Sequence, residues 1–122
     1  MPSIAHGVSG NRRPDFVLGD RYGTSCHALV THRAKLLLEE LGYSVLINKP
    51  YAGGFITEHY GRPQSGLHAI QIEINRGLYM DEASISPSVN FDSFTRDLEL
   101  FLSKLVELKD DQLTGSTPLA AE

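Results

Sequence analysis

The sequence predicts an α/β domain in which helices flank part of a mixed or parallel sheet. In residues 67–76, apolar Ile70, Ile72 and Ile74 alternate with polar side chains, which is the period of two expected for a strand with two different faces. Two short apolar runs with a helical pattern between them precede this segment, and another helical pattern follows it. This order of strands and helices favours a sheet that is covered on both sides.

The first long helix is expected to open at residues 23–26. Thr24 or Ser25 can accept a hydrogen bond from a free N–H of the first turn, and Gly42 stands where a left-handed cap is expected. The apolar side chains at helical spacing are those of Val30, Ala34, Leu37, Leu38 and Leu41.

Two predicted strands flank this helix. Residues 15–18 are a short apolar run that ends in a turn, and residues 43–48 are a second apolar run that Pro50 terminates. A strand, a helix and a strand at this spacing predict a right-handed crossover between parallel strands.

The remaining segments predict two further helices. Residues 51–60 are expected to form a short helix that begins near a pair of glycines, and residues 61–66 a loop. Residues 77–90 are expected to be irregular, with Asn90 capping a last helix. The apolar stripe predicted for that helix comprises Phe91, Phe94, Leu98, Leu102 and Leu105.

Composition limits the class of protein. The chain has 122 residues, 41% of them hydrophobic, and a net charge of −4. This length and composition predict one domain over residues 1–113 and a flexible tail over 114–122. Its basic residues are scattered singly, which argues against nucleic-acid binding, and no apolar run reaches the roughly 20 residues of a membrane span. The single Cys26 fits a reducing, cytoplasmic location.

Glu73 is the best candidate for acid–base chemistry. A carboxylate on the polar face of a strand can activate a water and return its proton to a leaving group. By spacing alone, the five histidines do not form a metal site, because no pair stands four residues apart on a helix.

Other residues admit two interpretations. Cys26, near a helix start and beside His27, could be an activated nucleophile, although a buried, inert cysteine is the better interpretation. The Gly53-Gly54 pair either holds an anion on free N–H groups or forms a tight turn. Three arginines next to strand ends or loops could bind a carboxylate or could be surface charges: Arg21, Arg62 and Arg76.

Three segments in order carry a family resemblance: PDFVLGDRYGTSC (14–26), NKPYAGGFITEHYG (48–61) and HAIQIEINRGLYMDE (68–82). From residue 1 to about residue 108, the sequence resembles the carboxyl-terminal half of the N-formylglutamate amidohydrolase (N-formylglutamate deformylase) family. The resemblance implies a zinc-carboxypeptidase-like (phosphorylase/hydrolase-like) fold. It also implies hydrolysis of N-formyl-L-glutamate, an N-acyl amino acid, to formate and glutamate in histidine breakdown.

The resemblance also implies residue roles. Glu73, within the family's Gln-Ile-Glu-Ile-Asn-Arg block, would be the general base or acid that acts on a metal-bound water. The residues implied to line the substrate pocket are Arg21, Asn48, Tyr51, Gly53, Gly54, Thr57, His59, Asn75 and Arg76.

The resemblance departs from the family at the metal site. In the family, the zinc ligands precede this region and end at the histidine of a His-Ser-Met-Pro motif, whereas this sequence begins Met1-Pro2-Ser3. We therefore expect the chain to lack the amino-terminal portion of the fold, with the zinc ligands upstream of Met1, and to be inactive in isolation. The alternative is a non-catalytic, shortened product that binds small carboxylates or self-associates through an exposed sheet edge.

Overall fold

The computed structural model describes residues 1–3 and 13–108, so the domain boundary expected after residue 113 lies outside the described residues. The strands are β1 (Phe16–Gly19), β2 (Val45–Ile47), β3 (Gln71–Ile74), β4 (Met80–Asp81) and β5 (Ser86–Pro87). The helices are α1 (Ala28–Glu40), α2 (Phe55–Tyr60) and α3 (Phe91–Val106), with 3-10 turns at Pro63–Ser65 and Arg76–Leu78.

The main sheet has three strands in the order β2-β1-β3. The β1 and β2 strands are parallel, as predicted for the strand–helix–strand crossover, and β3 is antiparallel to β1. The register of this second pair places Glu73 opposite Val17 and Gln71 opposite Gly19. A small mixed sheet with helices confirms the predicted α/β class.

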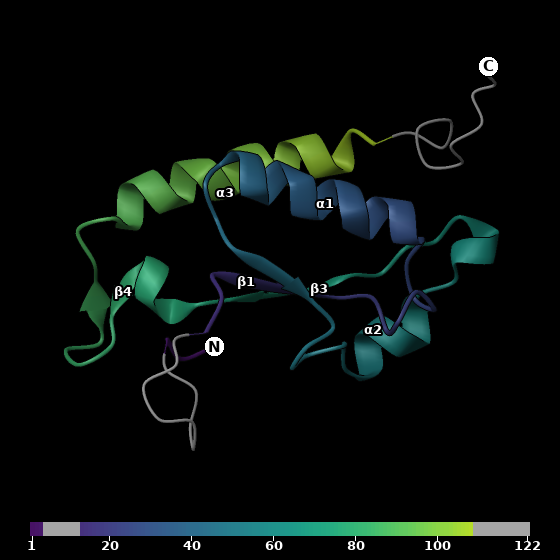
Figure 1. Ribbon diagram of the computed structural model, residues 1–122, viewed down its shortest axis with the longest axis horizontal. Helices are drawn as coiled ribbons and strands as arrows, with labels where there is room; N and C mark the ends of the chain where they lie inside the picture. Colours follow the sequence, from purple (N-terminus) through teal and green to yellow (C-terminus); the bar gives the residue numbers. More distant parts are fainter. Residues whose placement is uncertain (4–12, 109–122) are drawn as a thin grey trace.

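Helices α1 and α3 lie side by side on one face of the main sheet (Figure 1). Phe16 and Leu18 of β1 are almost completely buried against them, together with Phe101 of α3. The isoleucines at 70, 72 and 74 pack against the same core, so the predicted apolar face of β3 is confirmed. The opposite face is covered more lightly, by residues 51–54 and the short α2, rather than by a second layer of long helices (Figure 1).

Helix α1 begins later than the sequence predicts. His27 is the cap, and its Nδ1 accepts a hydrogen bond from the Leu29 N–H. Ser25 and Thr24, the predicted caps, donate their hydroxyls to the carbonyls of Ala69 and Arg21, so that prediction is wrong. The chain first forms a turn at residues 20–23, where the Asp20 carboxylate accepts the Gly23 N–H, and the helix cap moves two or three residues along, to His27. The predicted left-handed end at Gly42 is confirmed, with φ of 96°.

Helix α3 begins after Asn90, as predicted, but Asn90 makes no capping hydrogen bond through its side chain. Its buried stripe also differs. Phe101 is fully buried, whereas Phe91 and Leu102 are 40% and 41% exposed. The preceding segment, expected to be irregular, contains the β4–β5 hairpin, in which Met80 pairs with Pro87.

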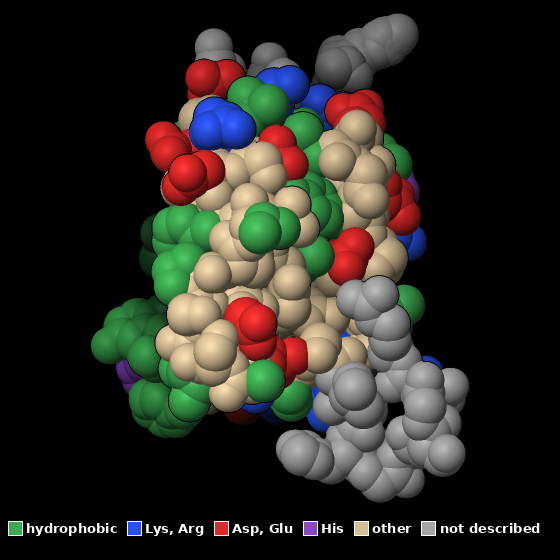
Figure 2. Space-filling view, turned by 90° about the vertical axis from the view of Figure 1, so that its left-hand side faces the viewer, with side chains coloured by type: hydrophobic (Ala, Val, Ile, Leu, Met, Phe, Trp, Pro, Cys, Tyr) green, Lys and Arg blue, Asp and Glu red, His purple; other side chains and the backbone are tan. Residues whose placement is uncertain are grey.

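The end of the molecule that carries this hairpin shows apolar and charged side chains interspersed (Figure 2). Ile85 and Val89 are the most exposed apolar residues there. Within residues 1–3 and 13–108, the helices are too short or too polar to cross a membrane.

Candidate active site

The candidate site begins with two polar side chains of β3 that point away from α1 and α3. Gln71 and Glu73 are both half-buried, and the Gln71 Nε2 donates to Glu73 Oε1 over 3.0 Å. On its other side, the Gln71 Oε1 accepts the backbone N–H of Gly54 over 2.9 Å. A chain of two hydrogen bonds therefore connects the predicted catalytic carboxylate to the glycine turn.

The glycine turn lies directly over the end of β1. Gly19 has room for no side chain, because a Cβ there would stand 2.6 Å from the carbonyl carbon and oxygen of Ala52. The Arg21 N–H donates to that same Ala52 carbonyl over 2.8 Å. Gly53 has a φ of 124°, a conformation that side-chain-bearing residues rarely adopt, which is one physical reason for glycine here. The Gly54 N–H, expected as an anion donor, is engaged by Gln71.

The carboxyl ends of the parallel strands β1 and β2 meet beside this turn. Asp20 and Asn48 exchange two hydrogen bonds of 3.0 and 2.9 Å, and Thr31 donates to the second Asp20 oxygen over 2.8 Å. Arg21 and Asn48 both have positive φ, of 53° and 64°. Such sparsely populated backbone conformations are held by their surroundings and cluster at functional sites.

Arg21 is a charged residue that contacts the turn directly. Its Nη1 donates to the Gly53 carbonyl over 3.2 Å, and its Nη2 lies 3.1 Å from the Glu58 carboxylate. The Glu58 side chain is 65% exposed, so this surface ion pair is weak. A ligand carboxylate could replace Glu58 without leaving a buried charge unpaired.

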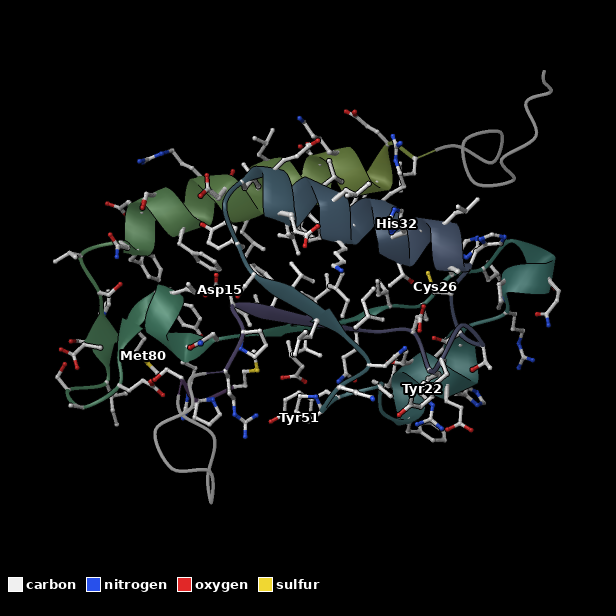
Figure 3. The ribbon with its side chains drawn as sticks, viewed as in Figure 1. Asp15, Tyr22, Cys26, His32, Tyr51 and Met80 are labelled. Carbon is white, nitrogen blue, oxygen red and sulfur yellow. The ribbon has the colours of Figure 1, made fainter. Side chains whose placement is uncertain are left out.

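Two further predicted residues frame the turn. Thr57 is buried, and its methyl group would lie 2.9 Å from a Cβ at Gly53. Tyr51 lies on the side of the sheet opposite α1 and α3 (Figure 3). The Arg13 guanidinium stands 5.5 Å from the centre of its ring and donates to its hydroxyl.

The other predicted pocket residues lie apart from this network, and their roles stay predictions. His59 is exposed on α2, stacked on Phe55. Asn75 is fully buried, donates to the carbonyls of residues 13 and 14 and accepts the Gly77 N–H, so it fixes backbone. Arg76 forms an ion pair with Glu82 at 3.4 Å.

Among the histidines that the structure describes, His27 and His68 lie close together. The His68 Nδ1 accepts the backbone N–H of His27, and the two rings are 6.5 Å apart. No group of three His, Cys, Asp or Glu side chains that could hold a metal ion occurs within residues 1–3 and 13–108. His6 lies outside the described residues.

Cys26 is completely buried between α1 and the sheet (Figure 3), which confirms the interpretation of a structural cysteine. Burial raises the pKa of its thiol, so little of it is present as the nucleophilic thiolate at neutral pH. This environment does not favour the activated-nucleophile interpretation.

The sequence analysis did not identify Arg13, Asp20 or Gln71 as site residues, although all three bind predicted site residues in the structure. The alternation along residues 67–76 placed Gln71 on the polar face beside Glu73 but gave no sign of its partner in the turn. Asp20 had a signal, because an aspartate after a buried strand commonly accepts turn N–H groups. Arg13 had none.

Comparison with known proteins decides the family. The model of the family described as N-formylglutamate amidohydrolase matches residues 1–80. The chain belongs to this family. The matched region includes the turn, Gln71 and Glu73, so the candidate site lies within the part of the chain that matches the N-formylglutamate amidohydrolase model.

Individual relatives agree with this assignment. The chain is 34% identical over 105 residues to an N-formylglutamate deformylase of Pseudomonas putida, covering 85% of this chain and 38% of that protein. It is 42% identical over 72 residues to the Pseudomonas aeruginosa deformylase, covering 58% of this chain and 27% of that one.

A solved structure has a similar fold. The N-formylglutamate amidohydrolase of Ralstonia eutropha JMP134 superposes with a TM-score of 0.80 at 37% identity, covering 88% of this chain and 40% of that chain. The chain thus spans about two fifths of the length of this solved N-formylglutamate amidohydrolase.

Proposed function

We propose that this chain supplies the catalytic carboxylate and part of the substrate pocket of an N-formylglutamate deformylase. The reaction is hydrolysis of the formyl amide of N-formyl-L-glutamate to formate and L-glutamate. The observation that carries the proposal is the placement of Glu73: one carboxylate oxygen is held by Gln71, and Oε2 has no hydrogen-bond partner among the described residues. A half-buried carboxylate with one free oxygen beside a backbone turn is suited to proton transfer.

In the proposed reaction, Glu73 takes a proton from the water that attacks the formyl carbon. It then returns that proton to the amine nitrogen as the carbon–nitrogen bond breaks, which releases formate and leaves the amino group of glutamate. Arg21 is the proposed partner of a substrate carboxylate, because its present partner Glu58 is largely exposed.

Zinc does not fit the described residues on their own. A hydrolytic zinc usually takes three protein ligands, and residues 1–3 and 13–108 contain no group of three candidate ligands. A zinc centre in this family member would need at least one ligand from outside those residues.

The test replaces Glu73 with glutamine. Because this chain spans only about two fifths of its solved relative, we would assay it alone and also as a chimera in which it replaces the matching 40% of the Ralstonia protein. We expect formate release from N-formyl-L-glutamate to fall by about 100-fold or more in Glu73→Gln, since general acid–base groups contribute about 10²–10⁴-fold. Formate would be measured enzymatically.

The matched control is Glu99→Gln, the same chemical change at an exposed position of α3 on the other side of the sheet. It should leave the rate unchanged. A folded, active chimera in which Glu73→Gln also keeps its activity would overturn the role of Glu73. A folded chimera inactive towards N-formyl-L-glutamate would overturn the proposed substrate.

A second candidate, self-association without catalysis, is favoured by the outer edge of β3. The pairing with β1 directs the N–H and C=O groups of Ile72 and Ile74 away from β1. Met1 uses part of this edge: its nitrogen donates to the Ile74 carbonyl over 2.6 Å, and the Arg76 N–H donates to the Met1 carbonyl over 2.7 Å. The groups of Ile72 remain available to a further strand.

We expect Ile72→Pro to weaken any such association, because proline removes the outward N–H that an added strand would need. Ile72→Ala is the matched control, since it shortens the same core-facing side chain and keeps the N–H. Sedimentation velocity over a range of concentrations would compare the two variants with the parent chain. Equal association of both variants would exclude the β3 edge as the interface.

A further inference from the structure

We infer that Gln71 is a positioning residue that holds the Glu73 carboxylate and couples it to the Gly53-Gly54 turn. The inference rests on the proposed function for the role of Glu73. The coupling itself rests on two hydrogen bonds, from Gly54 N–H to Gln71 Oε1 at 2.9 Å and from Gln71 Nε2 to Glu73 Oε1 at 3.0 Å.

The two partners fix the orientation of the Gln71 amide. The backbone N–H of Gly54 can only donate, so it requires the carbonyl oxygen of the amide. An ionised Glu73 carboxylate can only accept, so it requires the amide nitrogen. In a flipped amide, the Gln71 NH2 group would face the Gly54 N–H, and the Gln71 carbonyl oxygen would face the Glu73 oxygen. Gln71 therefore has one arrangement, in which it presents a donor to the deprotonated form of the base.

The Gly53-Gly54 turn, which holds the Gln71 carbonyl oxygen, is itself fixed by contacts that do not involve Gln71. The turn is pressed onto β1 where Gly19 lacks a side chain, and it is held there by the Arg21 N–H on the Ala52 carbonyl. Gln71 pairs with that same Gly19 across the sheet. Gln71 is thus tied to the end of β1 twice, through its backbone pairing with Gly19 and through its Oε1 on the turn. Its Nε2 then holds the Glu73 Oε1.

The same turn also carries the residue proposed to recognise the substrate. Arg21 donates to the Gly53 carbonyl, one residue before the N–H that holds Gln71. A carboxylate that displaces Glu58 from Arg21 therefore acts on a turn that is two hydrogen bonds away from Glu73. Substrate recognition and alignment of the base share one backbone segment.

The coupling is tested first by NMR on the 122-residue chain, without any need for turnover. Glu73→Gln should shift the backbone amide resonance of Gly54, because an amide at position 73 changes the hydrogen bond that Gln71 makes. In a Gln71→Leu background, the same change at 73 should leave Gly54 unshifted. In a Gln64→Leu background, with an exposed glutamine of the Pro63–Ser65 turn replaced instead, the shift should persist. A shift that survives Gln71→Leu overturns the coupling.

The kinetic test uses Gln71→Glu in the chimera. Glutamate is nearly the same shape and can still accept from Gly54, but it cannot donate to Glu73 and places a like charge beside it. We expect kcat to fall about 10- to 100-fold, as for other groups that orient a reacting residue, with KM changed by less than about 2-fold. Gln64→Glu, the same change at an exposed site, should alter neither.

The outcomes separate the two proposals. A higher KM at unchanged kcat would make Gln71 a substrate-binding residue, and an unchanged kcat and KM would leave it no role; either overturns the inference. If the parent chimera is folded and shows no turnover, the proposed function fails, whereas the Gly54 resonance still decides whether Gln71 couples the turn to position 73.

Discussion

Replacing Phe101 with alanine is expected to lower the free energy of unfolding by about 3–5 kcal/mol, the usual cost of deleting a buried aromatic side chain. Phe101 has 0% of its surface exposed and packs between α3 and β1, with its ring 6.4 Å from that of Phe16. Domains of this size are stable by only about 5–15 kcal/mol, so the variant should be partly unfolded at physiological temperature. Urea denaturation followed by circular dichroism would measure the loss.

Leu102→Ala is the matched control, because it shortens the neighbouring apolar residue of the same helix. Leu102 is 41% exposed, so we expect a loss of at most about 1 kcal/mol. Equal losses in the two variants would contradict the packing described for α3.

Phe101 is buried and Leu102 is partly exposed, and the helical spacing of apolar residues alone does not predict which of the two is buried. Both positions are apolar, and both continue a stripe through Phe94, Leu98 and Leu105 at helical spacing. Which of them faces the sheet depends on the rotation of α3 about its axis. That rotation is set by α1 and β1, which lie far away in the sequence.

In the candidate site too, some features could be predicted from the sequence and others could not. The polar and apolar faces of β3 could be predicted, because the alternation of side chains follows directly from the geometry of a strand. The hydrogen bond from Gly54 to Gln71 could not be predicted, because it depends on where the turn, 17 residues away in the sequence, packs against the sheet. Asn48 was predicted to line the pocket, but its two bonds to Asp20 require β1 and β2 to be aligned first. Family resemblance found these segments without explaining their contacts.

Replacing Gly19 with alanine is expected to disturb both the stability of the domain and the candidate site. The added Cβ would stand 2.6 Å from the carbonyl carbon and oxygen of Ala52 and 2.9 Å from the Gly53 nitrogen, all of them backbone atoms that cannot rotate away. The turn must move off β1, which stretches the bond from Arg21 N–H to Ala52. Overpacking of this kind costs about 1–3 kcal/mol.

Gly54→Ala provides the matched control for stability, because it adds the same methyl group in the turn that lies over Gly19. At Gly54, the nearest atom to a Cβ is the Gln71 Oε1 at 3.7 Å, which is an ordinary contact. In Gly19→Ala, we expect a lower midpoint of urea unfolding and a displaced Gln71 side-chain amide resonance, since moving Gly54 away releases the Gln71 carbonyl. An unchanged midpoint and an unchanged resonance would mean that the turn does not pack against Gly19. The hydrogen bonds that connect Arg21 to Glu73 through the turn would then not be fixed to β1.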